Sequence, residues 1–321
     1  MNASDLTSLF GVASDDERII KLFEKLSTLR RPRQPDRANH EYYDWVLVRK
    51  LGLELGFVDG EYQAATERFR WGHGKLLLAQ AYFYSGNDEI RKYSGNLPKG
   101  LCFSDTREQA NTKLSKFEST RRSYLNDTWD LDDYRITVSY KANDQAIDKL
   151  VCRLIPAPIK QTIQATPPAL EKIYNSFGQN INNREFRDLW PISLADQEHE
   201  ISENPTKLDL RESLGASLTF INSKTGLLFH SIILHRNRDQ ESQGWKGQLP
   251  LNLDFEDSPL TLFSKISAPP ASQGNSNLTG HAVWHFNDYT LHVLYSNIDN
   301  RLIRVNLITP GIWKCVEDYE Y

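Results

Sequence analysis

Histidines are the first residues of this sequence whose spacing could support chemistry. His281, His285 and His292 form the one histidine group. If 284–286 is part of a strand, His281 and His285 share a face, and with Asp288 they could hold a metal ion. The first half of the chain has Arg135 near one of the matching positions. We therefore favour incidental histidines at a strand end over a metal site.

Carboxylates also gather in places where paired acids could act on a glycoside. The groups are Asp130, Asp132 and Asp133; Asp254, Glu256 and Asp257; and Glu317, Asp318 and Glu320. Helix capping is sufficient to explain Asp105 and Asp257. Asp133 and Asp288 adjoin turns, where aspartate is favoured anyway. The acids therefore indicate solvated faces or a partner-binding surface rather than catalysis.

Recognised catalytic and cofactor motifs are absent from the sequence. It contains no G-x-x-x-x-G-K-[ST] phosphate loop, no G-x-G-x-x-G fingerprint, no G-x-S-x-G elbow and no H-E-x-x-H helix. Cys102, Cys152 and Cys315 are odd in number and far apart, which argues against a disulfide framework and a thiolate zinc site. We predict a protein that is not an enzyme and that binds no cofactor.

A long internal repeat organises the elements that must position any site. Segments 95–106 and 247–258 align at an offset of 152 and share Gly95 and Gly247, Leu97 and Leu249, Pro98 and Pro250, Leu101 and Leu253, Phe103 and Phe255, and Asp105 and Asp257. The flanking matches, in the same order, pair Leu9-Phe10-Gly11 with Ser176-Phe177-Gly178, Leu51-Gly52 and Phe57 with Leu214-Gly215 and Phe220, Trp129 with Trp284, Asp133-Tyr134 with Asp288-Tyr289, Tyr140 with Tyr295, and Leu150-Val151 with Leu302-Ile303. This pattern predicts a duplicated domain.

The repeat sets the predicted domain boundaries. Each copy has about 150 residues, an ordinary size for one domain. Between them, 156–168 carries four prolines and is typical of a semi-rigid linker. We predict a first α+β repeat at 1–156, a proline-rich linker at 157–167 and a second α+β repeat at 168–321.

Hydrophobic periodicity predicts the elements of one repeat. Ile19, Phe23 and Leu26 follow helical spacing within 5–29, and the second copy carries Phe186 and Trp190 in the same way. Strands are expected at 51–58 before an Asp-Gly turn, at 76–84, at 101–104 before a helix cap, and at 134–140 and 150–154. The fold class predicted for each repeat is α+β, an antiparallel sheet with helices on one face.

Charge and hydropathy restrict the partners and the location. Residues 1–156 hold 24 basic and 23 acidic residues, and 157–321 hold 14 and 19. The arginines in 30–37 could form a nucleic-acid arm, but a sequence pI near 6.1 favours a solvated loop, and no direct nucleic-acid binding is expected. No apolar run is long enough for a membrane span, and the N-terminus lacks the features of a secretory signal. We predict a cytoplasmic protein.

At 97–105 and 249–257, each followed by a helix that ends in Lys113-Leu114 or Lys265-Ile266, the chain resembles bacterial immunity proteins. These proteins neutralise polymorphic toxins, including effectors of type VI secretion. In the second copy Asn252 replaces the glycine found at Gly100. The resemblance implies a protein that binds a cognate toxin, commonly a nuclease or a cell-wall hydrolase, and blocks it. The missing export signal favours a nuclease-type toxin.

A nuclease must carry a basic cleft, so its inhibitor is expected to present acids and aromatic residues to it. The predicted partner-binding residues are Trp245, Asp254, Glu256, Glu317, Asp318, Glu320 and Tyr321. The alternatives are a hydrolase or ligand-binding protein with its site in the cleft between the two repeats, and a structural scaffold. A homodimer remains open as a further partnership.

Overall fold

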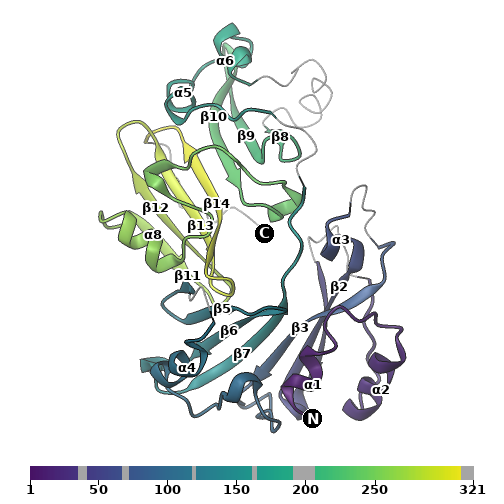
Figure 1. The fold of residues 1–321 in the computed structure, drawn as a ribbon. Coiled ribbons are helices and arrows are strands. Elements are labelled where there is room, and N and C mark those ends of the chain that lie inside the picture. The colour runs from purple at the N-terminus through teal and green to yellow at the C-terminus, as the bar shows by residue number, and fades with distance from the viewer. Residues whose placement is uncertain (35–41, 67–71, 118–120, 161–164, 191–206, 312–321) are drawn as a thin grey trace. The chain divides into compact units, whose positions relative to one another are not determined.

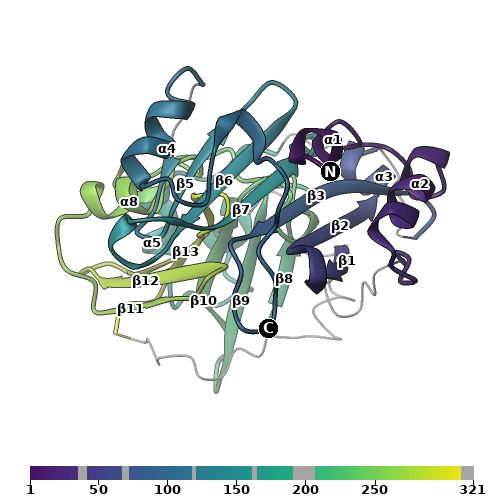
Figure 2. The same ribbon diagram turned by 90° about the horizontal axis from the view of Figure 1, so that it is seen from below.

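The computed structural model describes residues 1–34, 42–66, 72–117, 121–160, 165–190 and 207–311. The chain divides into two compact units, Met1–Ala157, called unit 1, and Pro158–Tyr321, called unit 2. Each unit is built on one seven-stranded sheet, and all neighbouring strands run antiparallel. The α+β class with two tandem units is confirmed (Figures 1 and 2).

Unit 1 places its sheet strands in the order β1-β2-β3-β7-β6-β5-β4. The strands are β1 (Tyr43–Val48), β2 (Leu53–Asp59), β3 (Leu76–Tyr84), β4 (Arg121–Arg122), β5 (Asn126–Asp130), β6 (Tyr134–Tyr140) and β7 (Ile147–Leu154). The α-helices are α1 (Ala3–Thr7), α2 (Glu17–Leu26), α3 (Gly60–Ala64) and α4 (Arg107–Leu114), and the short 3-10 helices are η2 (Arg49–Leu51), η3 (Pro98–Gly100) and η4 (Ala142–Asp144).

Unit 2 has the same strand order when it is counted from the opposite edge, β8-β9-β10-β14-β13-β12-β11. Its strands are β8 (Lys207–Leu210), β9 (Ala216–Ser223), β10 (Gly226–His235), β11 (Ser272–Asn275), β12 (Thr279–His285), β13 (Thr290–Ser296) and β14 (Arg301–Ile308). Its described helices are α5 (Leu170–Asn175), α6 (Arg184–Leu189), α8 (Pro259–Lys265), η5 (Asp239–Glu241) and η6 (Pro250–Asn252).

Each unit has its own hydrophobic core between its helices and one face of its sheet. In unit 1 the buried faces of α2 and α4 pack with strand residues such as Trp129. In unit 2 α6 and α8 pack with Trp284 and its neighbours. Trp129 pairs with Ile136 and Trp284 pairs with Leu291, so the two indoles occupy equivalent places in their sheets.

The repeated Gly-x-Leu-Pro segment folds identically in both units. Lys99 and Leu251 both have positive φ, 57° and 55°, and each lies in a 3-10 turn that begins at the proline. The Asp105 carboxylate accepts from the Cys102 amide at 2.7 Å and the Asp257 carboxylate from the Asp254 amide at 2.8 Å. The turn is therefore closed by an aspartate side chain in each copy.

A lysine completes this turn in both units. Lys113 Nζ donates to Asp105 Oδ1 at 2.8 Å and to the Gly100 carbonyl at 2.9 Å. Lys265 Nζ donates to Asp257 Oδ2 and to the Asn252 carbonyl, both at 2.7 Å. We call this arrangement the Lys–Asp staple, because it fixes the end of helix α4 or α8 to the turn that precedes the helix.

The repeated glycine makes room for an aromatic ring two residues earlier. A Cβ at Gly95 would come within 2.0 Å of the Met1 carbonyl oxygen and 2.6 Å of the Tyr93 hydroxyl, and one at Gly247 within 2.7 Å of the Trp245 ring. Tyr93 and Trp245 are both core residues. Steric exclusion of a side chain thus explains why both copies of the segment begin with glycine.

Several local predictions need correction. The expected strand at 101–104 is absent, and the segment is a turn. Asp59-Gly60 starts helix α3 rather than a hairpin turn, with Asp59 as its N-cap. Asp105 and Asp257 do not cap their helices: their carboxylates are used in the Lys–Asp staple, and the caps of α4 and α8 are Thr106 and Ser258.

The predicted match of Leu150 with Leu302 is wrong by three residues. Ile136 pairs with Cys152, and Leu291 pairs with Leu307. The register therefore aligns Leu150 with Val305 and Ile147 with Leu302. Both equivalent residues, Ile147 and Leu302, donate their amide to a repeat phenylalanine carbonyl at 3.1 Å.

Candidate functional site

A hydrogen-bonded serine, histidine and aspartate lie on the face of the unit 2 sheet opposite the core that its α-helices cover. Ser217 is on β9, His235 ends β10 and Asp239 begins η5. Ser217 pairs with Ile233 across the two strands, which places Ser217 and His235 diagonally on one face. Ser217 Oγ is 3.0 Å from His235 Nε2, and His235 Nδ1 is 2.6 Å from Asp239 Oδ2.

The loop after β10 returns Asp239 to the histidine. Arg238, Gln240 and Glu241 all have positive φ, which tightens the turn into a short 3-10 segment. The Arg211 guanidinium donates to the Gln240 carbonyl at 2.8 Å and so holds η5 close to the end of β8. The loop thus has a defined shape.

Arg304 on β14 fixes the other side of the aspartate. Its Nε donates to Asp239 Oδ2 at 2.7 Å and its Nη2 to Oδ1 at 3.0 Å. Burial by itself would raise the pKa of Asp239, but the hydrogen bonds from His235 and Arg304 outweigh it and hold this pKa below its ordinary value. The aspartate is therefore ionised and accepts a hydrogen bond from His235 Nδ1–H.

The imidazole is neutral at neutral pH. Burial lowers the pKa of His235, and the hydrogen bond with Asp239 offsets only part of that effect. With Nδ1 protonated, Nε2 accepts the hydrogen bond from the Ser217 hydroxyl. We call these three residues the Ser–His–Asp chain.

The Ser–His–Asp chain has the order of contacts required for nucleophilic acyl transfer. A base lies within hydrogen-bond reach of a hydroxyl and is oriented by a carboxylate. Ser217 is only 1% exposed and lies within a regular strand rather than on a sharp turn. The same contacts also satisfy three buried polar groups. The Ser–His–Asp chain therefore stabilises this part of unit 2 whether or not a substrate reaches it.

The sequence patterns do not predict the Ser–His–Asp chain. Its members lie at 217, 235 and 239 and belong to no catalytic motif. Only the register of β9 against β10 brings the serine to the histidine. The one local signal is the spacing of His235 and Asp239 across a loop, which is common in sequences and has little specificity.

Unit 1 has different residues at the equivalent positions. The registers of β2 with β3 and of β3 with β7 align Glu54, Tyr84 and Lys149 with Ser217, His235 and Arg304. There the Tyr84 hydroxyl donates to Glu54 Oε2 at 2.7 Å, and burial together with that contact raises the pKa of Tyr84. The Ser–His–Asp chain is thus specific to unit 2 and is not required by the repeated fold.

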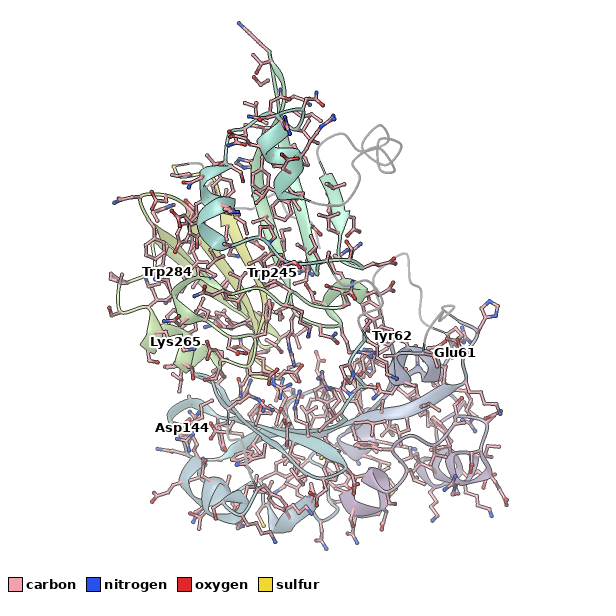
Figure 3. The ribbon with its side chains drawn as sticks, turned by 45° about the horizontal axis from the view of Figure 1, so that its top comes forward. Glu61, Tyr62, Asp144, Trp245, Lys265 and Trp284 are labelled. Carbon is pink, nitrogen blue, oxygen red and sulfur yellow. The ribbon has the colours of Figure 1, made fainter. Side chains whose placement is uncertain are left out.

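The structure places three of the predicted partner-binding residues. Trp245 is 5% exposed and belongs to the core of unit 2 (Figure 3), because Gly247 leaves space for its ring. Asp254 and Glu256 are exposed on the turn before α8. Asp254 Oδ1 accepts from the Glu256 amide at 2.8 Å. The remaining four, Glu317, Asp318, Glu320 and Tyr321, lie outside the described residues.

Glu256 is engaged by two arginines. Its Oε1 is 3.3 Å from Arg236 Nη2, and its Oε2 is 2.8 Å from Arg301 Nε. This carboxylate is therefore locally neutralised, although its side chain is 57% exposed. Of the three placed residues, Asp254 alone combines exposure with a charge that no described ion pair neutralises.

Two of the three grouped histidines come together. The rings of His281 and His292 have centroids 5.7 Å apart, whereas His285 Nδ1 lies 3.0 Å from Thr290 Oγ1. His292 Nδ1 is 2.8 Å from the Asn306 amide nitrogen. Within the described ranges, no group of three histidine, cysteine or acidic side chains is arranged to hold a metal ion.

Neither a protein-family model, nor a curated protein, nor a solved structure matches this chain. Among the described helices, none combines the length and the apolar character needed to cross a membrane. The proposals below therefore rest on the residues and contacts of the two units.

Proposed function

We propose that this protein is a bacterial immunity protein. In the cytoplasm it binds a cognate toxin, of the nuclease type delivered by type VI secretion, and blocks it without turnover of its own. The observation that carries the proposal is the contrast between a framework that is repeated contact by contact and side chains on the second face of the sheet that differ between the two units.

The framework is repeated in detail. The Lys–Asp staple, the glycine beside a buried ring and the buried tryptophan recur in both copies. The second face of the sheet differs, with Glu54 and Tyr84 in unit 1 where unit 2 has Ser217 and His235. Such divergence on a fixed framework supports a function that resides in side chains specific to each unit rather than in the shared fold.

Charge also supports a basic partner. Residues 157–321 carry 14 basic and 19 acidic residues, a net charge of −5. A nuclease gathers positive charge around its phosphate-binding cleft, and an acidic inhibitor would reach it faster by electrostatic steering. Asp254 fits this role better than Glu256, whose carboxylate is already neutralised by Arg236 and Arg301.

Co-expression tests the proposal directly. The toxin encoded by the neighbouring gene is expressed in a bacterial host with or without this protein, and growth is recorded. We expect the full chain to restore growth and to co-purify with the toxin as a stoichiometric complex. Failure to protect, together with no complex between the purified proteins at micromolar concentration, would refute the proposal.

A second candidate, an acyl hydrolase, is favoured by the Ser–His–Asp chain. In that reaction the Ser217 hydroxyl would attack an ester carbonyl, His235 would take its proton and return it to the leaving group, and water would release the acyl group. A fluorophosphonate probe and p-nitrophenyl esters distinguish the two candidates. Labelling or hydrolysis that is lost in Ser217→Ala but kept in Ser231→Ala would establish the hydrolase, since Ser231 pairs with Thr219 on the same face and contacts no described histidine. The immunity proposal expects neither signal.

A further inference from the structure

Tyr124 is an exposed aromatic residue on a hydrogen-bonded turn of unit 1. It lies between β4 and β5 and is 80% exposed, and it is the one aromatic side chain among the exposed large hydrophobic residues of the described ranges. The Ser123 amide donates to the Asn126 carbonyl at 2.9 Å, and Ser123 Oγ accepts from the Asn126 amide at 3.1 Å. The backbone that presents the phenol ring is thus closed on itself.

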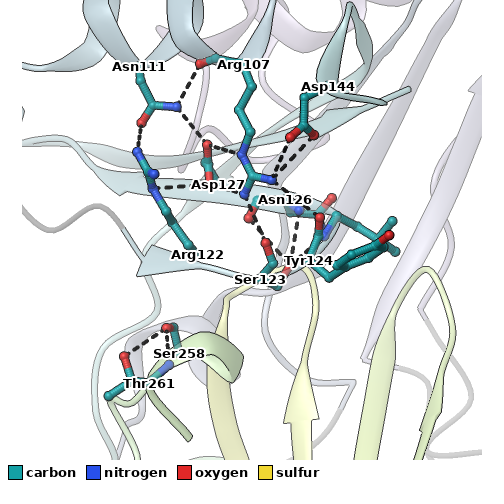
Figure 4. Close-up of polar contacts among 11 residues, drawn as sticks. Arg107, Asn111, Arg122, Ser123, Tyr124, Asn126, Asp127, Asp144, Ser258 and Thr261 are labelled. Atoms are coloured by element: carbon teal, nitrogen blue, oxygen red, sulfur yellow. Dashed lines mark hydrogen bonds and ion pairs between the residues drawn. The ribbon is translucent and has the colours of Figure 1, made fainter. Parts of the chain in front are cut away.

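Arg107 holds this turn through two of its backbone carbonyls (Figure 4). Its Nη2 donates to the Ser123 carbonyl at 2.9 Å and its Nη1 to the Tyr124 carbonyl at 3.4 Å. The same guanidinium forms a two-pronged ion pair with Asp127, at 2.6 and 3.0 Å. Asp127 is fully buried and also accepts from Asn111 at 2.8 Å. We call these three residues, Arg107, Asn111 and Asp127, the polar support.

The fold does not require the polar support. Helix α8 and strand β12 of unit 2 carry Pro259, Phe263 and Ala282 at the positions of Arg107, Asn111 and Asp127, as the caps and the strand registers show. In unit 2 the Phe263 ring packs against Trp284 and Tyr295, at centroid distances of 5.9 and 6.3 Å. Apolar packing therefore fills the same space.

The comparison of the two units indicates that the polar support holds the turn that carries Tyr124. A buried ion pair is no better for stability than well-packed apolar side chains of similar volume. What Arg107 adds, and Pro259 cannot, is a pair of hydrogen bonds to the carbonyls of the turn. A rigid turn with an exposed tyrosine loses little conformational entropy on binding.

The charges beside the ring indicate the partner's chemistry. Arg122 remains 48% exposed; its Nη2 donates to Asn111 Oδ1 at 2.6 Å, and its Nε lies 3.7 Å from Asp127 Oδ1. Asp144, 50% exposed, lies 3.4 Å from Arg107. The two guanidinium groups are thus balanced by Asp127 and Asp144, and Arg122 is the more exposed of the two arginines. Tyrosine and arginine together are the residue types that dominate binding energy in protein interfaces.

We propose that the 123–126 turn is a docking surface for the toxin. Tyr124 inserts into an apolar recess of the toxin, and Arg122 pairs with a carboxylate at the rim of that recess. This inference rests on the proposed immunity function and adds the surface that performs it.

The test measures affinity with the full chain. The probe is a catalytically inactive form of the toxin domain encoded by the neighbouring gene, and binding is recorded by biolayer interferometry. Tyr124→Ala is expected to weaken binding by at least about 30-fold. The matched control is Leu278→Ala, at the exposed tip of the β11–β12 hairpin, where Ser276 closes a similar turn. We expect this control to change affinity less than about threefold.

A second variant separates display from contact. Arg107→Pro, Asn111→Phe and Asp127→Ala together copy the apolar packing of unit 2 and leave Tyr124 in place. The protein should fold, as circular dichroism would check, and bind about five- to tenfold more weakly because the turn is no longer held.

The outcomes distinguish the two proposals. Wild-type binding with Tyr124→Ala within threefold of it would overturn the docking surface and leave the immunity function standing. No binding by the wild-type chain would overturn both. If Tyr124→Ala alters the oligomeric state and leaves toxin affinity unchanged, a second copy of the chain covers the turn, and the docking proposal is also overturned.

Discussion

Unit 1 and unit 2 share a framework and differ in what surrounds it. Both close the Gly-x-Leu-Pro turn with an aspartate and a lysine, and both bury a tryptophan at the same place in the sheet. Beneath the β4–β5 hairpin, unit 1 has the ion pair of Arg107 with Asp127. Beneath the equivalent β11–β12 hairpin, unit 2 has Phe263. The contacts of the turn are therefore part of the shared framework, whereas the space beneath the first hairpin is filled differently in the two units.

The difference also shows which residues are free to take on a function. On the second face of the sheet, Glu54 and Tyr84 in unit 1 replace Ser217 and His235 in unit 2, while each pair keeps one hydrogen bond. Buried polar positions must be satisfied, but the framework does not dictate how. The divergent positions are therefore where each unit could acquire its own chemistry or partner.

Removal of the equivalent tryptophans tests whether the two cores are equally important. Trp129 and Trp284 are 0% and 2% exposed, so replacement of either by alanine leaves a large cavity. We expect each variant to lose about 3–5 kcal/mol of unfolding free energy, measured by urea denaturation. A cost below about 1 kcal/mol for one of them would contradict the equivalence of the two sheets.

The polar support of unit 1 predicts strong non-additivity. Arg107→Met leaves the fully buried Asp127 without its principal partner, and we expect a loss of about 3 kcal/mol. The triple variant that copies Pro259, Phe263 and Ala282 removes the buried charge as well. It should recover most of that loss, to within about 1 kcal/mol of wild type. A triple variant less stable than Arg107→Met would show that the two solutions are not interchangeable.

The Lys–Asp staple should contribute equally in both units. Asp105 and Asp257 are 6% and 8% exposed, and each carboxylate serves one lysine and one amide. Their replacement by alanine is expected to cost about 2 kcal/mol in each case, as differences in chemical denaturation. Costs that differ by more than about 1 kcal/mol would indicate that the staple matters in one unit alone.

His292 should make unit 2 sensitive to mild acid. Burial, with the nearby positive charges of His281 and Arg304, lowers the pKa of His292 to about 4. The unfolded chain titrates near 6.5, so it binds the proton first as the pH falls. Stability is thus complete above pH 6.5 and declines towards pH 4, by about 1–2 kcal/mol for this partly buried group.

Replacing His292 by the residue found at the equivalent position of unit 1 provides the control for this pH effect. The strand register aligns His292 with Thr137. His292→Thr should therefore flatten the decline between pH 6.5 and 4 in denaturation experiments, while His285→Thr, at an exposed position, should not. An unchanged pH profile for His292→Thr would assign the acid sensitivity to other groups.

The sequence supports the large-scale features because each has a local physical signature. The duplication and a helix across Ile19, Phe23 and Leu26 are both predicted, and the structure has two units of one strand order and places helix α2 over these residues. The carboxylate of Asp105 was assigned to the wrong contact, because caps and turns favour the same residue types. Its lysine partner lies eight residues along the chain, beyond the range of a capping motif.

The site was less accessible from the sequence. The contact between Ser217 and His235 depends on strand register, and the match of Leu150 with Leu302 shows that register was misjudged by three residues in the last strand. The sequence predicts Trp245 as a surface aromatic residue, whereas in the structure its ring is buried in the space beside Gly247. Tyr124 has no sequence signal, since its importance comes from Arg107, which lies 17 residues earlier.

Isothermal titration of the toxin domain from the neighbouring gene into the full-length protein is the most direct test of the immunity function. We expect a saturable stoichiometric complex with nanomolar affinity, and toxin activity that falls in proportion to the complex formed. Absence of binding heat at micromolar concentrations, with toxin activity unaffected by excess protein, would contradict the proposed function.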